Sequence, residues 1–135
     1  LNPRPPRLVT SRRPVEPGTS GGISPYGTLA TLAGAALIGL AGGAFTSLGG
    51  GGFLWVAVTL GGVCGSLFDS LLGATVQAIY HCPACDKETE RHPLHSCGKG
   101  TVQMRGWGWL SNDWVNFLAS VLGALTAAAT WSWLP

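Results

Sequence analysis

A short polar stretch of the chain carries cysteine and histidine residues at the spacing of a zinc site. The sequence reads HCPAC at 81–85 and HPLHSCG at 92–98. Two cysteines three positions apart can chelate one ion from a single turn, and soft sulfur and imidazole donors favour Zn²⁺ over Mg²⁺ or Ca²⁺. We expect one structural zinc ion to be bound by Cys82, Cys85, Cys97 and His95, with His92 and His81 as alternative fourth ligands.

Two other interpretations of these cysteines stay open: a redox pair, or reduced thiols without a role. A disulfide is disfavoured because the charge pattern described below places the stretch in the cytoplasm, where thiols are kept reduced. A zinc ion also meets a structural need, since a short loop without a core of its own requires a cross-link to hold its shape. Cys64 stands inside an apolar run, and we expect it to pack there as a small residue.

The sequence places one carboxylate, Asp69, inside a long apolar run. A charge within a membrane segment is costly and by default indicates a functional site. Ser66, Ser70 and Gln77 lie at helical spacing around it, so these side chains form a polar stripe on one helix face. The alternatives are a polar contact between packed helices, or an aspartate that reaches the cytoplasmic interface.

A second polar cluster occupies residues 111–116, at the start of the last apolar run. Asp113 and Asn116 are three positions apart, so they share a face of a helix that begins there. Asn112 or Asp113 can also simply cap that helix. We expect the oxygens of Asp69, Asp113 and Asn116 to converge on Mg²⁺, a cation usually held by one or two carboxylates together with substrate phosphates and water.

A glycine-rich loop, GTSGGISPYG at 18–27, is the candidate phosphate site. Successive glycines let backbone N–H groups point at an anion, and the N-terminus of the following helix adds its dipole. The loop matches neither the Walker pattern nor the dinucleotide fingerprint, so a plain connector is the alternative. The residues expected to bind phosphates of a nucleotide are Arg12, Arg13, Gly18, Thr19, Ser20, Gly21 and Gly22.

These residues belong to a chain with the composition of an integral membrane protein. Of its 135 residues 10% are charged, against roughly 25% in soluble domains, and the mean hydropathy is +0.30. Asp69 is the one charge within residues 27–80, and residues 114–135 carry none. Such gaps exceed the ~20 apolar residues that cross a bilayer. The net charge of +2 does not suggest a nucleic-acid partner, which requires a clustered basic face.

We predict an all-α integral membrane fold with about three transmembrane helices and a small zinc-ribbon-like cytoplasmic loop. The parts are a basic arm with the glycine loop at 1–26, two transmembrane helices at 27–80 joined by a glycine hairpin at 49–52, the zinc-binding loop at 81–112, and a third transmembrane helix at 113–135. Gly39 and Gly43 have the spacing that allows close helix contact. One helix over 53–80 would measure about 42 Å, against ~30 Å of hydrocarbon, so it must tilt, break or protrude.

Charge and aromatic residues set the expected orientation in the cell membrane. All eight Lys and Arg lie in the arm or within residues 81–110, and the positive-inside rule places both segments in the cytoplasm. The glycine hairpin and the end of the third span then lie outside. Tryptophans are expected to mark the two interfaces, and they stand at positions Trp55, Trp107, Trp109, Trp114, Trp131 and Trp133.

Three motifs in order resemble those of one family. The segments EPGTSGGIS at 16–24, GSLFDSLLGATVQ at 65–77 and NDWVNF at 112–117 together resemble the integral membrane family known as domain of unknown function 92, which includes transmembrane protein 19 and the plant phytyl-phosphate kinase of vitamin E synthesis. The resemblance covers nearly the whole chain, and the cysteine loop resembles that of the prokaryotic branch. Family members are longer and this chain begins at Leu1. We therefore expect it to be the C-terminal half of a protein whose N-terminal half completes the site.

A more distant likeness is to CTP-dependent phosphatidate cytidylyltransferases and dolichol kinases. Ser66 and Asp69 stand where their first motif has an aspartate and a glutamate, and Asp113 and Asn116 stand at two aspartates of their second. The loss of two carboxylates favours one metal ion over two. The resemblance implies a kinase that acts on a polyprenyl- or phytyl-type lipid phosphate with Mg²⁺ and CTP. The alternatives are a lipid-phosphate cytidylyltransferase and a non-enzymatic membrane transport or scaffold subunit.

Overall fold

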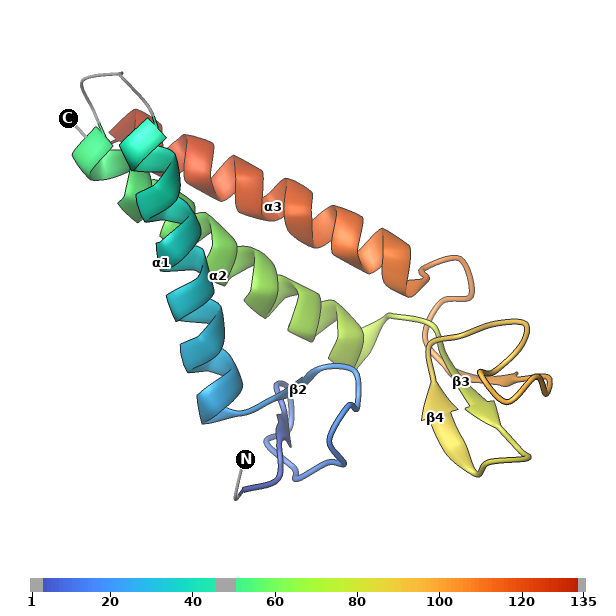
Figure 1. Cartoon of the computed structure of the whole chain (residues 1–135). Helices are drawn as coiled ribbons and strands as arrows, with labels where there is room; N and C mark the ends of the chain where they lie inside the picture. Colours follow the sequence, from blue (N-terminus) through green and yellow to red (C-terminus); the bar gives the residue numbers. More distant parts are fainter. Residues whose placement is uncertain (1–3, 46–50, 134–135) are drawn as a thin grey trace.

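The structure, a computed structural model, describes residues 4–45 and 51–133. Three helices dominate this part of the chain: α1 (Pro25–Phe45), α2 (Gly51–Thr75) and α3 (Asn112–Trp133). Each contains a segment long and apolar enough to cross a membrane, at Pro25–Phe45, Phe53–Thr75 and Asn112–Trp133. The expected three membrane helices are therefore confirmed, and they form the elongated body in Figure 1.

Helix α2 packs against both other helices through glycines. A methyl group built on Gly61 would lie 2.5 Å from the carbonyl oxygen of Gly123, and one on Gly65 would lie 2.8 Å from that of Ala119. On the other side, a methyl group on Gly39 of α1 would lie 2.6 Å from the carbonyl oxygen of Trp55. Small residues thus bring the helix backbones together, as expected for helices that associate in lipid.

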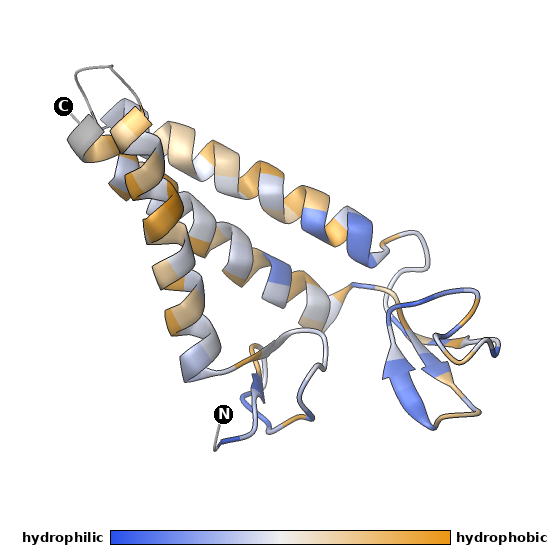
Figure 2. Cartoon of the chain, viewed as in Figure 1, coloured by the Kyte–Doolittle hydropathy of each residue, from blue (hydrophilic) through white to orange (hydrophobic). Residues whose placement is uncertain are grey.

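The outer surface of the three helices is apolar, as a membrane requires. Leu37 and Ile38 of α1 are 67% and 68% exposed, and Leu125 of α3 is 62% exposed. Figure 2 shows apolar residues along the helices and hydrophilic residues gathered at one end of the molecule. In water these exposed side chains would be unfavourable, whereas hydrocarbon chains solvate them at no cost.

The second apolar run does not form one long helix. Helix α2 ends at Thr75, where the N–H groups of Val76 and Gln77 both donate to the carbonyl of Leu72 at 3.0 and 2.9 Å. Residues 79–82 continue as strand β3 (Ile79–Cys82). The mismatch between a 28-residue helix and the bilayer is resolved by this early end. Asp69 is then six residues, or about 9 Å, from the end of its helix.

The cysteine loop folds as a small three-stranded antiparallel sheet. Strand β3 pairs with β4 (Lys87–Thr89) on one side and with β5 (Val102–Arg105) on the other. Ile79 and Leu110 are each 2% exposed and Cys82 is fully buried, so the segment has a core of its own. The expectation of a loop without any core is therefore wrong, because the apolar residues after Thr75 belong to this core rather than to the membrane helix.

The N-terminal arm is ordered by backbone pairing. Strand β1 (Arg7–Leu8) pairs antiparallel with β2 (Gly22–Ile23), and Val15 donates to the carbonyl of Pro6 at 2.9 Å. Ser24 then caps α1, since its hydroxyl accepts the N–H of Gly27 at 3.1 Å. Pro25 takes the first helical position, where a missing N–H costs nothing. The helix therefore begins at Pro25, two residues before the expected membrane segment at 27–80.

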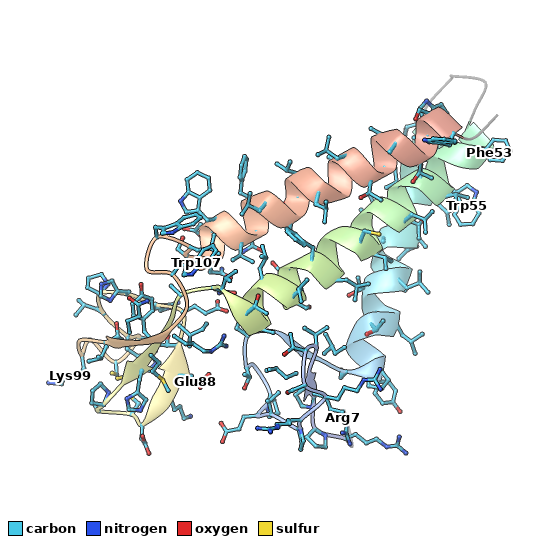
Figure 3. All side chains as sticks on the ribbon, turned by 180° about the vertical axis from the view of Figure 1, so that it is seen from behind. Arg7, Phe53, Trp55, Glu88, Lys99 and Trp107 are labelled. Atoms are coloured by element: carbon cyan, nitrogen blue, oxygen red, sulfur yellow. The ribbon has the colours of Figure 1, made fainter. Side chains whose placement is uncertain are left out.

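The arm and the cysteine loop lie at the same end of the helices (Figure 1). In Figure 3, Arg7, Glu88 and Lys99 gather at this end, and Phe53 and Trp55 lie at the other. Of the expected glycine hairpin at 49–52, Gly51 and Gly52 open α2, while residues 49 and 50 lie outside the described residues. This arrangement agrees with a chain that crosses the membrane twice, through α1 and α2, between the arm and the cysteine loop.

Cysteine labelling tests which side of the membrane this end faces. Phe45, at the far end of α1, is 91% exposed, and Ser11 lies in the arm. With an impermeant thiol reagent on intact cells, Phe45→Cys is expected to react and Ser11→Cys to react only after permeabilisation, because the positive-inside rule predicts that the end with the arm faces the cytoplasm. The reverse pattern would overturn the orientation. Ser47, just before the expected hairpin, lies outside the described residues.

Candidate functional site

Four predicted zinc ligands gather in the cysteine loop. The ligand atoms of Cys82, Cys85, His95 and Cys97 all lie within 4.8 Å of one another. The Sγ atoms of Cys82 and Cys97 are 3.6 Å apart, and Nδ1 of His95 is 3.2 Å from Sγ of Cys97. Two thiolates bound to one zinc ion at ~2.3 Å lie less than ~4.6 Å apart, so a small contraction of the cluster is enough for all four atoms to bind one ion.

Two tight turns shape this cluster. The N–H of Cys85 donates to the carbonyl of Cys82 at 3.3 Å, and the N–H of Gly98 donates to that of His95 at 2.9 Å. Each turn ends at a residue with positive φ: Asp86 has φ 50° and Gly98 has φ 78°. Glycine adopts this conformation without strain, which explains its position directly after Cys97.

The other two histidines have different partners. The ring of His92 stacks on Tyr80 with centroids 4.4 Å apart, and its Nδ1 lies 3.3 Å from the hydroxyl of Thr101. His81 lies with Nε2 at 3.0 Å from a carboxylate oxygen of Asp86. Of the three candidate histidines, the structure therefore brings His95 to the cysteines. The cluster can bind a metal ion such as zinc.

The thiols of this cluster influence each other's ionisation. The hydrogen bond with the His95 side chain lowers the pKa of Cys97 to about 6, whereas the hydrogen bond with Cys97 raises the pKa of Cys85 to about 11. At neutral pH the Cys97 thiolate of the metal-free cluster thus lies beside the protonated thiol of Cys85. A zinc ion must displace the remaining protons, so its binding weakens as the pH falls.

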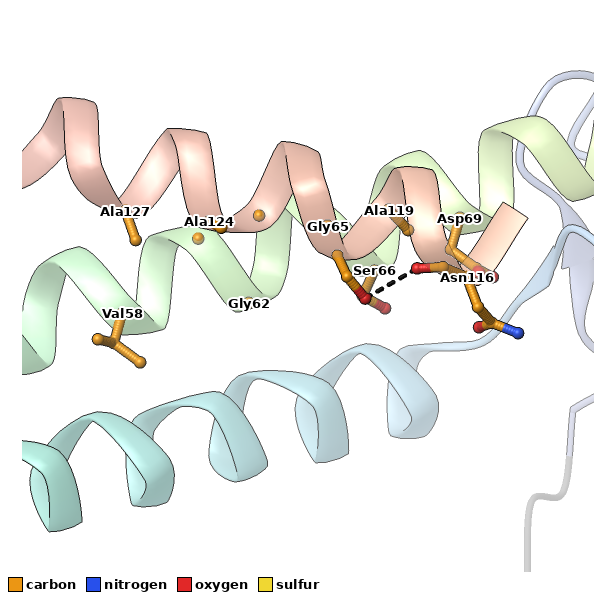
Figure 4. A pocket seen from close by; sticks show the side chains of 12 residues that line it. Val58, Gly62, Gly65, Ser66, Asp69, Asn116, Ala119, Ala124 and Ala127 are labelled. Carbon is orange, nitrogen blue, oxygen red and sulfur yellow. Dashed lines mark hydrogen bonds between the residues drawn. The ribbon is translucent and has the colours of Figure 1, made fainter. Parts of the chain in front are cut away.

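A groove of about 530 Å³ lies between α2 and α3 (Figure 4). Its polar end is formed by Ser66 and Asp69 of α2 and by Asn116 and Ser120 of α3. The Asn116 amide donates to the carbonyl of Asn112 at 3.0 Å, and the Ser120 hydroxyl donates to the carbonyl of Asn116 at 2.8 Å. The other lining residues are small or apolar: Val58, Gly61, Gly62, Gly65, Ala119, Gly123, Ala124 and Ala127.

Asp113 lies at a different place from Asp69 and Asn116. It lines a separate groove of about 340 Å³ with Ser111, Trp114 and Phe117. Of the three oxygen ligands expected to converge, the structure thus brings Asp69 and Asn116 to one groove and places Asp113 on another.

The glycine loop is docked on the end of α2. Gly21 has φ 81°, and a methyl group built on it would overlap the backbone of Ala74. The Ser20 hydroxyl donates to Oε1 of Gln77 at 2.8 Å. Gly18 has φ 93° and faces open space, while Arg12 and Arg13 are exposed at the turn of the arm. Gly18 and Gly21 therefore allow the backbone conformation of the loop, and Gly21 also allows the loop to pack closely against Ala74.

A second groove, of about 170 Å³, joins the glycine loop to α2. It is lined by the end of the loop, by the first turns of α1 and by one face of α2 that includes Ser66 and Ser70. Ser66 lines this groove as well as the one that contains Asp69. The two polar grooves therefore lie on either side of one serine, which sequence spacing alone does not indicate.

Arg105 is a structural residue that the sequence pattern did not single out. Its guanidinium donates to the carbonyl of Gly73 at 2.9 Å, near the C-terminal end of α2. A cation there offsets the helix dipole and satisfies a carbonyl that has no partner within the helix. One arginine in strand β5 thus fixes the sheet to α2. No local signal distinguishes it from the other arginines.

Replacing Arg105 by alanine is expected to destabilise the junction between α2 and the sheet. Loss of a hydrogen bond from a charged donor costs roughly 1.5–3 kcal/mol, which should lower the thermal midpoint of the detergent-purified protein by several degrees. Arg91→Ala is the matched control, because Arg91 is exposed. Equal midpoints for the two variants would show that the contact with Gly73 contributes nothing.

Comparisons with known proteins agree with this architecture. Residues 1–124 match the family described as "Integral membrane protein DUF92". Protein PGR of Arabidopsis thaliana is 34% identical over 93% of this chain and 45% of its own length. An uncharacterized membrane protein of Methanocaldococcus jannaschii is 46% identical over 51% of this chain and 28% of its own length. No solved structure matches. The chain spans less than half the length of either relative, and it belongs to the DUF92 family of integral membrane proteins.

Proposed function

We propose that this chain supplies part of the active site of an integral membrane kinase that phosphorylates a polyprenyl- or phytyl-type lipid phosphate, with CTP as donor. The observation that carries the proposal is the position of Ser66 between two grooves. One groove has the glycine loop and the start of α1, and the other has Asp69 and Asn116. Phosphoryl transfer needs a phosphate-binding loop next to polar residues that can hold a cation. Its catalysis consists of positioning the reactants and stabilising their charge.

The groove residues fit a single Mg²⁺ ion. Asp69 offers a carboxylate, and Asn116 offers an amide oxygen, since its amide nitrogen donates to the carbonyl of Asn112. Mg²⁺ is commonly held by one or two carboxylates plus substrate phosphates and water, so this sparse set is sufficient. When bound, the ion would neutralise charge on the phosphates. Asp113 is left out of this proposed ligand pair because it lines the other groove.

The remaining residues have proposed roles in binding. Backbone N–H groups at the start of α1, together with the glycine loop, favour an anion, and Arg12 and Arg13 add positive charge at the same end. The apolar continuation of the Asp69 groove toward Val58 would accept the hydrocarbon tail of the substrate. Zinc would have a structural role in the sheet. Both the arm and the sheet would lie in the cytoplasm, where CTP is available.

The decisive experiment is turnover of phytyl phosphate by the full-length parent protein in detergent. CTP labelled at the γ-phosphate should transfer its label to the lipid, whereas label at the α-phosphate should stay on the nucleotide. Transfer of the α-label with release of pyrophosphate would identify a cytidylyltransferase instead. Absence of any nucleotide-dependent product would contradict the proposal and favour a transport or scaffold role.

Valine in the glycine loop is expected to weaken use of the nucleotide. A methyl group on Gly22 would lie 3.0 Å from the carbonyl oxygen of Thr19, so Gly22→Val should distort the loop and raise the apparent KM for CTP at least about tenfold. Gly21→Val should also reduce stability, because its side chain would overlap Ala74. Gly34→Val, in an open position on α1, is the control. Unchanged KM values in folded loop variants would make the loop a connector.

A further inference from the structure

We infer that Gln77 is a positioning residue, which ties the glycine loop to the end of α2 and to the start of α3. The inference rests on the proposed function only for its consequence in nucleotide use. Its structural part stands on its own. Gln77 is 2% exposed, and it is one of two buried polar residues in the part of the chain that the structure describes. Its position just after α2 puts it at the point where all three motifs of the chain meet.

The side chain of Gln77 contacts two of these motifs directly. Its Oε1 accepts the hydroxyl of Ser20, in the glycine loop, at 2.8 Å. Its Nε2 donates to Oδ1 of Asn112, the first residue of α3, at 3.5 Å. Gln77 itself ends the motif that contains Asp69. A buried amide that left either group unpaired would be costly, so both contacts favour one orientation of the side chain.

The backbone around Gln77 is fixed by the segment that leads into α3. Val76 accepts the N–H of Trp107 at 2.9 Å, and Ala78 donates to the carbonyl of Leu110 at 2.9 Å. Gly106 has φ 81°, and a methyl group built on it would overlap the carbonyl of Gln77. Residues 76–78 are thus a rigid platform. The Gln77 side chain can therefore hold the glycine loop in place, because these contacts fix the backbone of Gln77.

The loop has a close-fitting contact beside this hydrogen bond. Gly21 approaches the backbone of Ala74, and a methyl group on Gly73 would lie 2.6 Å from the hydroxyl of Ser20. Neither contact is directional, so the Ser20–Gln77 hydrogen bond sets where the loop sits along α2. The same loop leads through Ser24 into α1 and lines the groove next to Ser66. A loop that slides or lifts from α2 would change the distance between phosphate-binding backbone and the Asp69 groove.

The test compares two side chains of the same shape at position 20. Ser20→Thr keeps the hydroxyl and Ser20→Val removes it, and Ser11→Ala in the exposed turn controls for the arm itself. In the full-length protein, tryptic cleavage after Arg7, within the paired strand β1, reports how often the arm opens, and mass spectrometry quantifies that product. We expect Ser20→Val to be cut about fivefold faster than Ser20→Thr, the change that follows from losing one hydrogen bond. Equal rates would overturn the inference.

Gln77→Met removes the same hydrogen bond from the other partner with little change in volume. Because it also removes the contact with Asn112, it should be cut at least as fast as Ser20→Val, and adding Ser20→Val to it should change the rate little, since the Ser20–Gln77 hydrogen bond is already absent. Additive effects would overturn the inference. Where the parent turns over CTP, Ser20→Val should raise the KM for CTP while Ser20→Thr restores it, with kcat little changed. If the parent shows no turnover, the proposed function fails and the cleavage rates still decide the role of Gln77.

Discussion

Serine in place of Cys82 is expected to reduce the zinc content of the purified protein from about one ion per chain to near zero. The Cys82 side chain is fully buried at the end of β3, with its Sγ 3.6 Å from that of Cys97. Apparent binding energies of structural zinc reach ~10–16 kcal/mol in small metal-binding domains, so the ion is a major part of their folding energy. Elemental analysis measures the loss, and faster hydrogen exchange in β3 to β5 should accompany it.

Two pairs of variants make this prediction specific. Cys64→Ser changes a thiol within α2, away from the cluster, and should leave zinc content unchanged. His95→Ala should lose zinc, whereas His92→Ala should keep it, because the His92 ring stacks on Tyr80. Parent protein prepared under reducing conditions without added chelator that still contains no zinc would end the hypothesis of a zinc site. Zinc retained in His95→Ala and lost in His92→Ala would instead change the fourth ligand.

The membrane helices and the metal cluster are the parts that sequence predicts best. Each depends on a local pattern: a gap between charges of more than ~20 residues, or paired thiols three positions apart. The end of α2 could not be predicted in the same way. Val76, Ala78 and Ile79 are as apolar as membrane residues, yet Ala78 and Ile79 are buried in the core under the small sheet. Composition does not distinguish burial in protein from burial in lipid.

Which polar residues share the groove between α2 and α3 depends on the register of the two helices, which the sequence does not reveal. In the antiparallel pair, Gly61 contacts Gly123 and Gly65 contacts Ala119. Moving four residues forward along α2 thus corresponds to moving four residues backward along α3. The next step places Asp69 level with Val115 and Asn116, so Asn116 joins it in the groove. Spacing within α3 predicted that Asp113 and Asn116 share a face, whereas the two residues line different grooves, and only the packing against α2 distinguishes them.

Asparagine in place of Asp69 is expected to abolish turnover of the lipid phosphate by the full-length parent protein. If Asp69 holds the cation that neutralises the phosphates, its loss removes several kcal/mol of stabilisation, which corresponds to at least about a 100-fold lower rate. Asparagine has nearly the same shape, so the groove itself should be unchanged. Asp113→Asn is the matched control because Asp113 lines the separate groove. We expect it to reduce turnover less than about tenfold.

Stability separates this catalytic role from a structural one. A carboxylate within a membrane helix costs ~2.5–3.5 kcal/mol on insertion scales, and asparagine removes that charge. Asp69→Asn should therefore fold as well as the parent, with an equal or higher thermal midpoint in detergent. If Asp69 served only as a polar packing contact, Asp69→Asn would instead lower the stability and preserve turnover in the folded fraction. Loss of turnover in Asp113→Asn as severe as in Asp69→Asn would show that both aspartates serve the metal. Helices α2 and α3 would then have to approach more closely, when substrate binds, at the end that carries the arm and the cysteine loop.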